Sequence, residues 1–269
     1  MTRRIAVAAT APLGADVLDR LALHHDVVLL LTRPDRPRGR GQKLAPPPAK
    51  EAAEVLGIPV AQPARLDETV ELGADTVVVC AYGLLVPDSL LDRALWLNVH
   101  PSLLPRWRGA APVERALMAG DERTGVTIHR TVSELDAGPI AAQRAFEIHR
   151  DDDAGAVYAR SAEIAAELLD EVLAQDRPVF APQPEDGVTY ADKIRPEDRF
   201  LDLSRPAREL VDRVRALSPH IGARAVVDGR PLIVWRARAG ADGSLELLEV
   251  QPEGRRRMTY DEYVRGLRE

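Results

Sequence analysis

Short apolar runs and helically spaced apolar residues alternate along the first half of the chain. Ile5–Ala8 and Val27–Leu31 have the length of buried strands, and Val17, Leu18 and Leu21 recur between them at helical spacing. A strand, a helix and a second strand in this order predict a parallel α/β sheet. Further runs of strand length are Thr76–Cys80, Leu95–Val99, Val126–Arg130 and Ile140–Phe146.

The second half of the chain changes character after a long amphipathic pattern. Apolar residues between Val157 and Leu173 keep helical spacing and predict a helix that closes the first domain. Arg177–Pro196 is rich in proline and predicts a linker. A helical stripe from Ala207 to Leu217 then precedes strand-like runs at Ala223–Val227, Leu232–Trp235 and Leu245–Val250. We therefore expect a catalytic domain at 1–176, a linker at 177–203 and a small β-rich domain at 204–269.

Composition and charge narrow the class of protein. No apolar run reaches the 18 or so residues that span a bilayer, and no export signal is recognised, so we expect a cytoplasmic protein. Cys80 is the only cysteine and lies among apolar neighbours, which predicts an inert buried thiol. The net charge is -6, yet residues 33 to 50 contain six basic residues and one acid, a local charge of +5. This basic island is a candidate for contact with an anionic partner.

Candidate catalytic side chains lie where one predicted strand ends. Asn98 and His100 are two positions apart, so on a strand their side chains project to the same side. Pro101 lacks a ladder donor and helps to end the strand there. Because ligands bind at the carboxyl ends of strands in open α/β sheets, this exit favours a site. Asp136, followed by Ala137 and Gly138, is the third candidate.

These three residue types match the needs of an amine that attacks a formyl carbon. The Asn98 carboxamide can donate to the oxyanion, and loss of such a donor commonly lowers the rate by about 100- to 1000-fold. His100 can polarise the formyl oxygen and move a proton, because the reference pKa of histidine is about 6.5. Asp136 can orient the imidazole, stabilise its cation and assist a proton relay. Spacing alone, however, indicates only a polar pocket, since both short motifs are common.

Longer motifs around these residues resemble the folate-dependent formyltransferase family. The matching segments are, in chain order, Ala81–Pro87, Asn98–Pro112, Gly120–Asp121, Thr124–Ile128 and Leu135–Gly138. The resemblance implies a Rossmann-like α/β domain with a mostly parallel sheet, followed by a small, shortened OB-like β-barrel domain. It also implies that the family's catalytic Asn, His and Asp correspond to Asn98, His100 and Asp136.

The same resemblance implies 10-formyltetrahydrofolate as the formyl donor. Backbone groups would hold the pterin edge, and leucine side chains would cover its flat faces. The donor-binding residues implied in this way are Tyr82, Gly83, Leu84, Leu85, Val86, Ser102, Leu103, Leu104, Pro105, Val132 and Leu135.

Thr32–Leu44, which overlaps most of this basic island, resembles the loop with which the tRNA-formylating members of the family engage the acceptor stem. A solvated surface loop is the alternative if the family is set aside. Thr189–Ile194 and Pro231–Trp235 resemble the linker and C-terminal domain of the same members. The resemblance thus implies formylation of the methionyl amino group of initiator tRNA, for translation initiation. The residues expected to meet tRNA phosphates are Arg33, Arg36, Arg38, Arg40 and Lys43.

Two segments depart from the family pattern. Ala9–Leu13 replaces a Gly-Thr-Pro stretch, so no substrate contact is carried over to it. Only a turn remains between Ala239 and Leu245, where relatives have additional strands. We therefore expect a shortened barrel, and tRNA binding that is either weaker or more dependent on the loop at residues 33–43.

Three other functions share the same residues and stay open at this point. They are formylation of an amino sugar nucleotide, hydrolysis of the formyl folate to formate, and binding of folate or tRNA without turnover.

We expect His24 and His25 to face water. His129, His149 and His220 lack partners at metal-ligand spacing, so we predict no metal site. We expect a monomer, although the sequence does not fix the oligomeric state.

Overall fold

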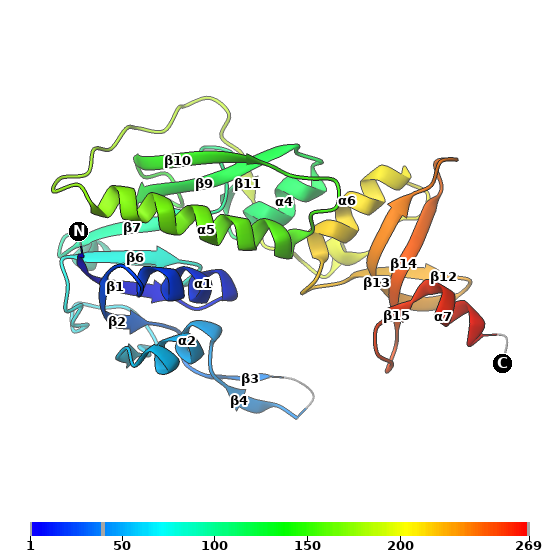
Figure 1. The fold of residues 1–269 in the computed structure, drawn as a ribbon, viewed down its shortest axis with the longest axis horizontal. Coiled ribbons are helices and arrows are strands. Elements are labelled where there is room, and N and C mark those ends of the chain that lie inside the picture. The colour runs from blue at the N-terminus through cyan, green and yellow to red at the C-terminus, as the bar shows by residue number, and fades with distance from the viewer. Residues whose placement is uncertain (1, 39–40, 268–269) are drawn as a thin grey trace. The chain divides into compact units, whose positions relative to one another are not determined.

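A computed structural model describes residues 2–38 and 41–267, without the side chain of Arg38. The chain forms two compact units (Figure 1). The first contains the chain up to Arg108, together with Gly125–Ala145 and Ala159–Thr189. The second contains Gly109–Thr124, Phe146–Tyr158 and the chain from Tyr190 onward. The division expected at 1–176, 177–203 and 204–269 stays a prediction.

The first unit is built on a seven-stranded sheet with the order β10-β9-β7-β6-β1-β2-β5. Strands from β7 to β5 pair in parallel, whereas β9 runs antiparallel to β7. Every strand predicted in this region is present, which confirms the mostly parallel fold. The strands are β1 (Arg4–Ala9), β2 (Asp26–Leu31), β5 (Val60–Ala61), β6 (Thr76–Cys80), β7 (Leu95–His100), β9 (Arg123–Arg130) and β10 (Ile140–Glu147).

The middle of the sheet is covered on both faces. The residues of β1 from Ile5 to Ala9 are fully buried, as near-continuous apolar parallel strands usually are. Helix α1 (Pro12–Leu21) packs against β1 and β6. A Cβ at Gly14 would lie 2.6 Å from the carbonyl oxygen of Cys80, so only glycine lets the helix approach this closely. Cys80 is buried, as predicted, and burial raises the pKa of its thiol.

Helix α5 (Ala154–Leu173) contains the whole of the predicted amphipathic segment. Its residue Asp170 accepts contacts from two histidines, at 2.6 Å from His24 Nδ1 and 2.9 Å from His25 Nε2. The expectation that both histidines face water is wrong for His25. The His25 ring is buried, and its Nδ1 accepts the backbone N–H of Arg3. His24 is exposed.

The second unit contains a four-stranded antiparallel sheet with the order β12-β13-β14-β15. Leu210, Val214 and Leu217 of helix α6 share a core with the buried strand residues Val234 and Val250. This confirms the predicted small β-rich part. Elements of the second unit include α4 (Pro112–Met118), η1 (Glu197–Arg199), α6 (Ala207–Leu217), β12 (Ala223–Val227), β13 (Arg230–Ala239), β14 (Leu245–Pro252), β15 (Met258–Thr259) and α7 (Tyr260–Arg265).

Several short elements are present that the apolar pattern does not predict. Helix α2 (Pro48–Leu56) begins at a proline and ends before Gly57, whose φ of 70° makes a left-handed cap. The basic island forms an antiparallel hairpin of β3 (Arg36–Arg38) and β4 (Lys43–Ala45). The others are α3 (Asp88–Leu91), β8 (Arg108–Gly109) and β11 (Tyr190–Ala191). Within the described residues, no helix is long and apolar enough to cross a membrane.

Candidate active site

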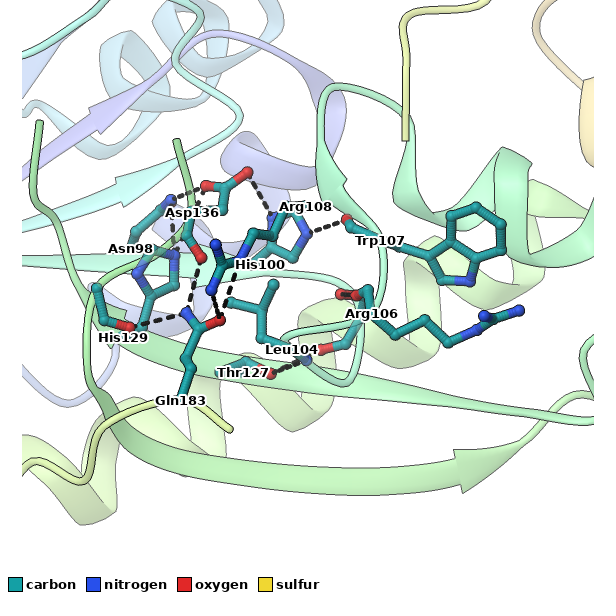
Figure 2. Close-up of polar contacts among 12 residues, drawn as sticks. Asn98, His100, Leu104, Arg106, Trp107, Arg108, Thr127, His129, Asp136 and Gln183 are labelled. Carbon is teal, nitrogen blue, oxygen red and sulfur yellow. Dashed lines mark hydrogen bonds and ion pairs between the residues drawn. The ribbon is translucent and has the colours of Figure 1, made fainter. Parts of the chain in front are cut away.

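Asn98 and His100 lie within the last three residues of strand β7, at the carboxyl edge of the parallel strands (Figure 2). They occupy alternate positions, so the pleat directs both side chains to one face of the sheet. The His100 side chain is only 5% exposed. The strand ends where Pro101 follows, as the sequence predicts. Strand β7 alone thus sets the positions of two of the three predicted catalytic side chains, Asn98 and His100.

Asp136 joins them from the loop that follows β9. Its Oδ1 accepts a hydrogen bond from Asn98 Nδ2 at 3.1 Å, and its Oδ2 lies 3.6 Å from His100 Nδ1. The backbone of Asp136 has a φ of 47°, a left-handed conformation that aspartate tolerates better than most residues. The structure therefore brings Asn98, His100 and Asp136 into one cluster.

The hydrogen bonds of His100 indicate where its proton lies. Nε2 is 2.8 Å from the backbone carbonyl oxygen of Trp107, which can only accept, so Nε2 carries the proton in the neutral ring. Nδ1 then faces Asp136 as the free base. Burial lowers the pKa of His100, while the Asp136 carboxylate and the Trp107 carbonyl act in the opposite direction. His100 is consequently held as a neutral base at neutral pH.

A second histidine, His129, completes the cluster and was not predicted as a site residue. It lies on β9 directly opposite Asn98 in the β7–β9 register. Its side chain is 2% exposed, and its Nε2 lies 3.1 Å from Asn98 Nδ2 and 3.7 Å from Asp136 Oδ1. This pairing depends on the antiparallel register between β7 and β9, which the sequence alone does not reveal.

Gln183 supports the Asp136 loop from the segment predicted as a linker. Its Nε2 donates to the backbone carbonyl oxygens of Asp136, at 2.7 Å, and of Gly138, at 2.8 Å. Its Oε1 accepts two N–H groups of Arg108, at 2.8 and 3.1 Å. A Cβ at Gly138 would collide with the carbonyl oxygen of Arg130. Gln183 thus holds the backbone at Asp136 and Gly138, and Gly138 packs closely against Arg130 at the end of β9.

Comparison with known proteins assigns the chain to a family. Residues 3–173 match the formyl transferase family, and residues 193–241 match the formyl transferase C-terminal domain. The chain belongs to the formyl transferase family. It is 41% identical to a methionyl-tRNA formyltransferase of Halorhodospira halophila over 100% of the chain and 97% of that protein. It is 39% identical to a methionyl-tRNA formyltransferase of Paracoccus denitrificans over 98% of the chain and 97% of that protein.

Solved structures agree with this fold. A methionyl-tRNA formyltransferase from Clostridium thermocellum aligns with a TM-score of 0.65 at 15% identity, over 93% of this chain and 98% of that one. An N-formyltransferase from Helicobacter canadensis aligns with a TM-score of 0.66, also at 15% identity, over 88% of each chain. At this identity the similarity concerns the fold alone.

The residues expected to bind the donor lie on three segments of this formyl transferase. Tyr82–Val86 directly follows β6, the neighbour of the catalytic strand. Tyr82 is buried, which raises the pKa of its hydroxyl to about 12. Leu85 is 84% exposed and Leu135 is also exposed. The Ser102 hydroxyl donates to the Arg106 carbonyl at 2.7 Å. Gly83, Leu103, Leu104, Pro105 and Val132 complete the expected set, with only Leu104 fully buried among them.

The basic hairpin is anchored at its base by an ion-pair network. Lys50 Nζ lies 2.9 Å from Asp35 Oδ1 and 2.9 Å from Gln62 Oε1, and Gln62 Nε2 donates to the Arg33 carbonyl at 2.8 Å. Arg36 is exposed on β3. Lys43, on the opposite strand β4, is exposed as well. Arg33, which precedes β3, is half-buried. Arg40 and the side chain of Arg38 lie outside the described residues.

No metal centre is evident among the described residues. No group of three His, Cys, Asp or Glu side chains within 2–38 and 41–267 is arranged to hold an ion.

Proposed function

We propose that this formyl transferase moves the formyl group of 10-formyltetrahydrofolate to the amino group of methionyl-tRNA, as a methionyl-tRNA formyltransferase. The observation that carries the proposal is the cluster of Asn98, His100 and Asp136 at the end of β7, with its contacts of 3.1 and 3.6 Å. It occurs in a chain that is similar along its whole length to enzymes of that name.

In the proposed reaction, the amine nitrogen bonds to the formyl carbon and the bond from that carbon to folate N10 breaks. The amine must lose a proton as the new bond forms. His100 Nδ1 accepts that proton, directly or through a water, because Nε2 is already protonated and bonded to Trp107. Asp136 stabilises the resulting imidazolium across 3.6 Å. The proton then passes to the leaving N10.

Asn98 is the proposed donor to the oxyanion. In the structure, both Nδ2 hydrogens of Asn98 face protein acceptors, which are Asp136 Oδ1 and His129 Nε2. Donation to the formyl oxygen therefore requires one of these bonds to be exchanged for the substrate. The bond to Asp136 is the one to exchange, because this carboxylate also faces His100 and is attracted to the imidazolium once His100 gains a proton.

The residues present fit a flat, polar-edged donor. Tyr82 provides a buried hydroxyl that has no hydrogen-bond partner among the described residues. Leu85 and Leu135 leave apolar surface accessible on two of the expected segments. An aromatic ring system with hydrogen-bonding edges requires this combination of polar and apolar groups. Bound donor supplies the formyl carbon that the cluster acts on.

The exposed cations of the β3–β4 hairpin support tRNA as the acceptor. Arg36 and Lys43 extend from opposite strands of the hairpin, so both can reach one phosphate backbone. A small acceptor such as an amino sugar nucleotide does not require a basic hairpin at this position. The hairpin thus favours a nucleic-acid acceptor among the members of the family.

The proposal is tested by supplying the donor with each acceptor in turn. We expect formylmethionyl-tRNA when methionyl-tRNA is present, and no product with amino sugar nucleotides. Product only from an amino sugar nucleotide overturns the proposed acceptor. Formate release at the same rate with and without acceptors indicates a hydrolase. Donor binding without turnover under every condition indicates a binding module.

A further inference from the structure

His129 is a buried polar side chain for which the proposed reaction has no role. It projects from β9 onto the same face as its cross-strand partner Asn98, since directly opposed residues of an antiparallel pair point to the same side. Its ring lies edge-on to the ring of His100, with 6.4 Å between centroids. A buried imidazole between two proposed catalytic groups is costly unless its nitrogens are bonded.

The hydrogen bonds of His129 define a single neutral tautomer. Nδ1 lies 3.1 Å from the backbone carbonyl oxygen of Arg130, which can only accept, so the proton is on Nδ1. Nε2 is left with a lone pair directed at Asn98 Nδ2, 3.1 Å away. His129 therefore acts as a pure acceptor toward the Asn98 amide.

This acceptor determines which end of the carboxamide faces the reacting groups. If the amide were turned over, its carbonyl oxygen would face both the lone pair of His129 and the carboxylate of Asp136. Asp136 alone is a weaker constraint, since its carboxylate also interacts with His100. The hydrogen bond of His129 Nε2, by contrast, is to Asn98 Nδ2. His129 can hold one amide hydrogen while the other is passed to the substrate.

We propose that His129 is a positioning residue that retains one N–H of Asn98 throughout the reaction, so that the other N–H is free to move from Asp136 to the formyl oxygen. The inference rests on the proposed function and names how its oxyanion donor is kept oriented. The ionisable groups that face His129 are His100 from β7 and Asp136 from the following loop. Neither competes for Nε2 as a donor in the neutral cluster.

The kinetic test compares His129→Leu, which removes the acceptor, with His129→Gln, which restores one. We expect His129→Leu to lower kcat by about 10-fold or more, as part of the loss seen when an oxyanion donor is removed. KM for donor and tRNA should stay within about 2-fold, because the interaction is used in the transition state. His129→Gln should recover most of kcat.

His25→Leu is the matched control, because it removes another buried, bonded imidazole from the first unit, outside the cluster. It should lower thermal stability while leaving kcat per folded molecule unchanged. Equal kcat for wild type and His129→Leu overturns the inference. Failure of the glutamine variant to recover kcat, when its melting temperature matches that of wild type, also overturns it.

A spectroscopic measurement on the wild-type protein does not depend on turnover. Nitrogen-15 NMR of the His129 ring should show a protonated Nδ1 and a bare Nε2 coupled to the Asn98 side-chain amide. A proton on Nε2 overturns the inference even if every variant folds poorly. If wild type does not formylate methionyl-tRNA at all, the proposed function fails instead, so the two failures are distinguishable.

Discussion

Gln183 donates a 2.7 Å hydrogen bond to the backbone carbonyl of Asp136, although 47 residues separate them in the chain. The same side chain accepts two bonds from Arg108. Arg108 lies eight residues after His100 in the sequence. Gln183 therefore links the two stretches of chain that carry the base and the carboxylate of the cluster.

Replacing Gln183 by Ala should weaken the hold on the Asp136 loop. We expect kcat to fall by about 5- to 10-fold, since a net hydrogen bond contributes about 1 kcal/mol. Steady-state kinetics with saturating methionyl-tRNA checks this. Gln175→Ala is the control, because the exposed Gln175 side chain donates to the Glu171 carbonyl in helix α5, outside the cluster. Similar losses in both variants would mean that Gln183 has no special connection to the site.

His100→Ala and Asp136→Asn should lower turnover far more than donor affinity. Both groups act as charge and protons move, so their contribution appears in the transition state. We expect kcat to fall by about 100-fold or more for His100→Ala, the scale of general acid–base catalysis. Donor affinity, measured by calorimetry, should change by less than about 3-fold. A parallel loss of donor binding and turnover would show a structural role instead.

The pH dependence of turnover should follow the protonation of His100. Burial lowers its pKa below the ordinary value of about 6.5, so the ring stays neutral and able to accept a proton to a pH below 6.5. The acid limb of kcat should accordingly lie below pH 6.5. Asp136 acts to raise this pKa, so Asp136→Asn should move the limb to still lower pH. A limb above pH 6.5, or a shift in the other direction, contradicts this assignment.

The hairpin arginines should contribute to tRNA binding through phosphates. Changing Arg36, Arg38 and Arg40 to Ala should raise KM for methionyl-tRNA and leave donor affinity unchanged. Each lost phosphate contact should reduce the slope of log affinity against log salt by about 1. Arg65→Ala is a suitable control, because its side chain is 86% exposed and lies outside the hairpin. An unchanged salt slope excludes these arginines from the interface.

Gly138→Ala should disturb the Asp136 loop because the new methyl group collides with the Arg130 carbonyl. We expect a loss of about 1 to 3 kcal/mol in the free energy of unfolding, as for other overpacked sites. Chemical denaturation measures this loss. Gly266→Ala is the control, because its Cβ would lie 3.6 Å from the nearest atom, an ordinary contact. Equal stability of the two variants would mean that the loop moves aside without cost.

The main strands and long helices could be predicted because their apolar patterns are strong. The runs at Thr76–Cys80 and Ala223–Val227 coincide with β6 and β12, and the stripe from Ala207 to Leu217 coincides with α6. Short elements such as the β3–β4 hairpin carry no such pattern, since charged and proline residues dominate there. Their structure depends on contacts with other parts of the chain.

The candidate site was predictable only where its residues are close in sequence or lie within long motifs. Asn98 and His100 share a strand, and Asp136 lies in a motif that resembles the family. His129 and Gln183 could not be found in this way. The position of His129 depends on the register between β7 and β9, and that of Gln183 on the path of a proline-rich segment. Both are properties of tertiary structure.

The contacts among Lys50, Asp35 and Gln62 hold the base of the β3–β4 hairpin in place. If the segment from Arg36 to Lys43 were replaced by another sequence, its two ends would still join the first unit at the same positions. Chimeras that carry the hairpin of a relative would thus compare hairpin sequences while the cluster of Asn98, His100 and Asp136 stays the same. Such chimeras would separate the effects of the hairpin sequence from those of the catalytic cluster.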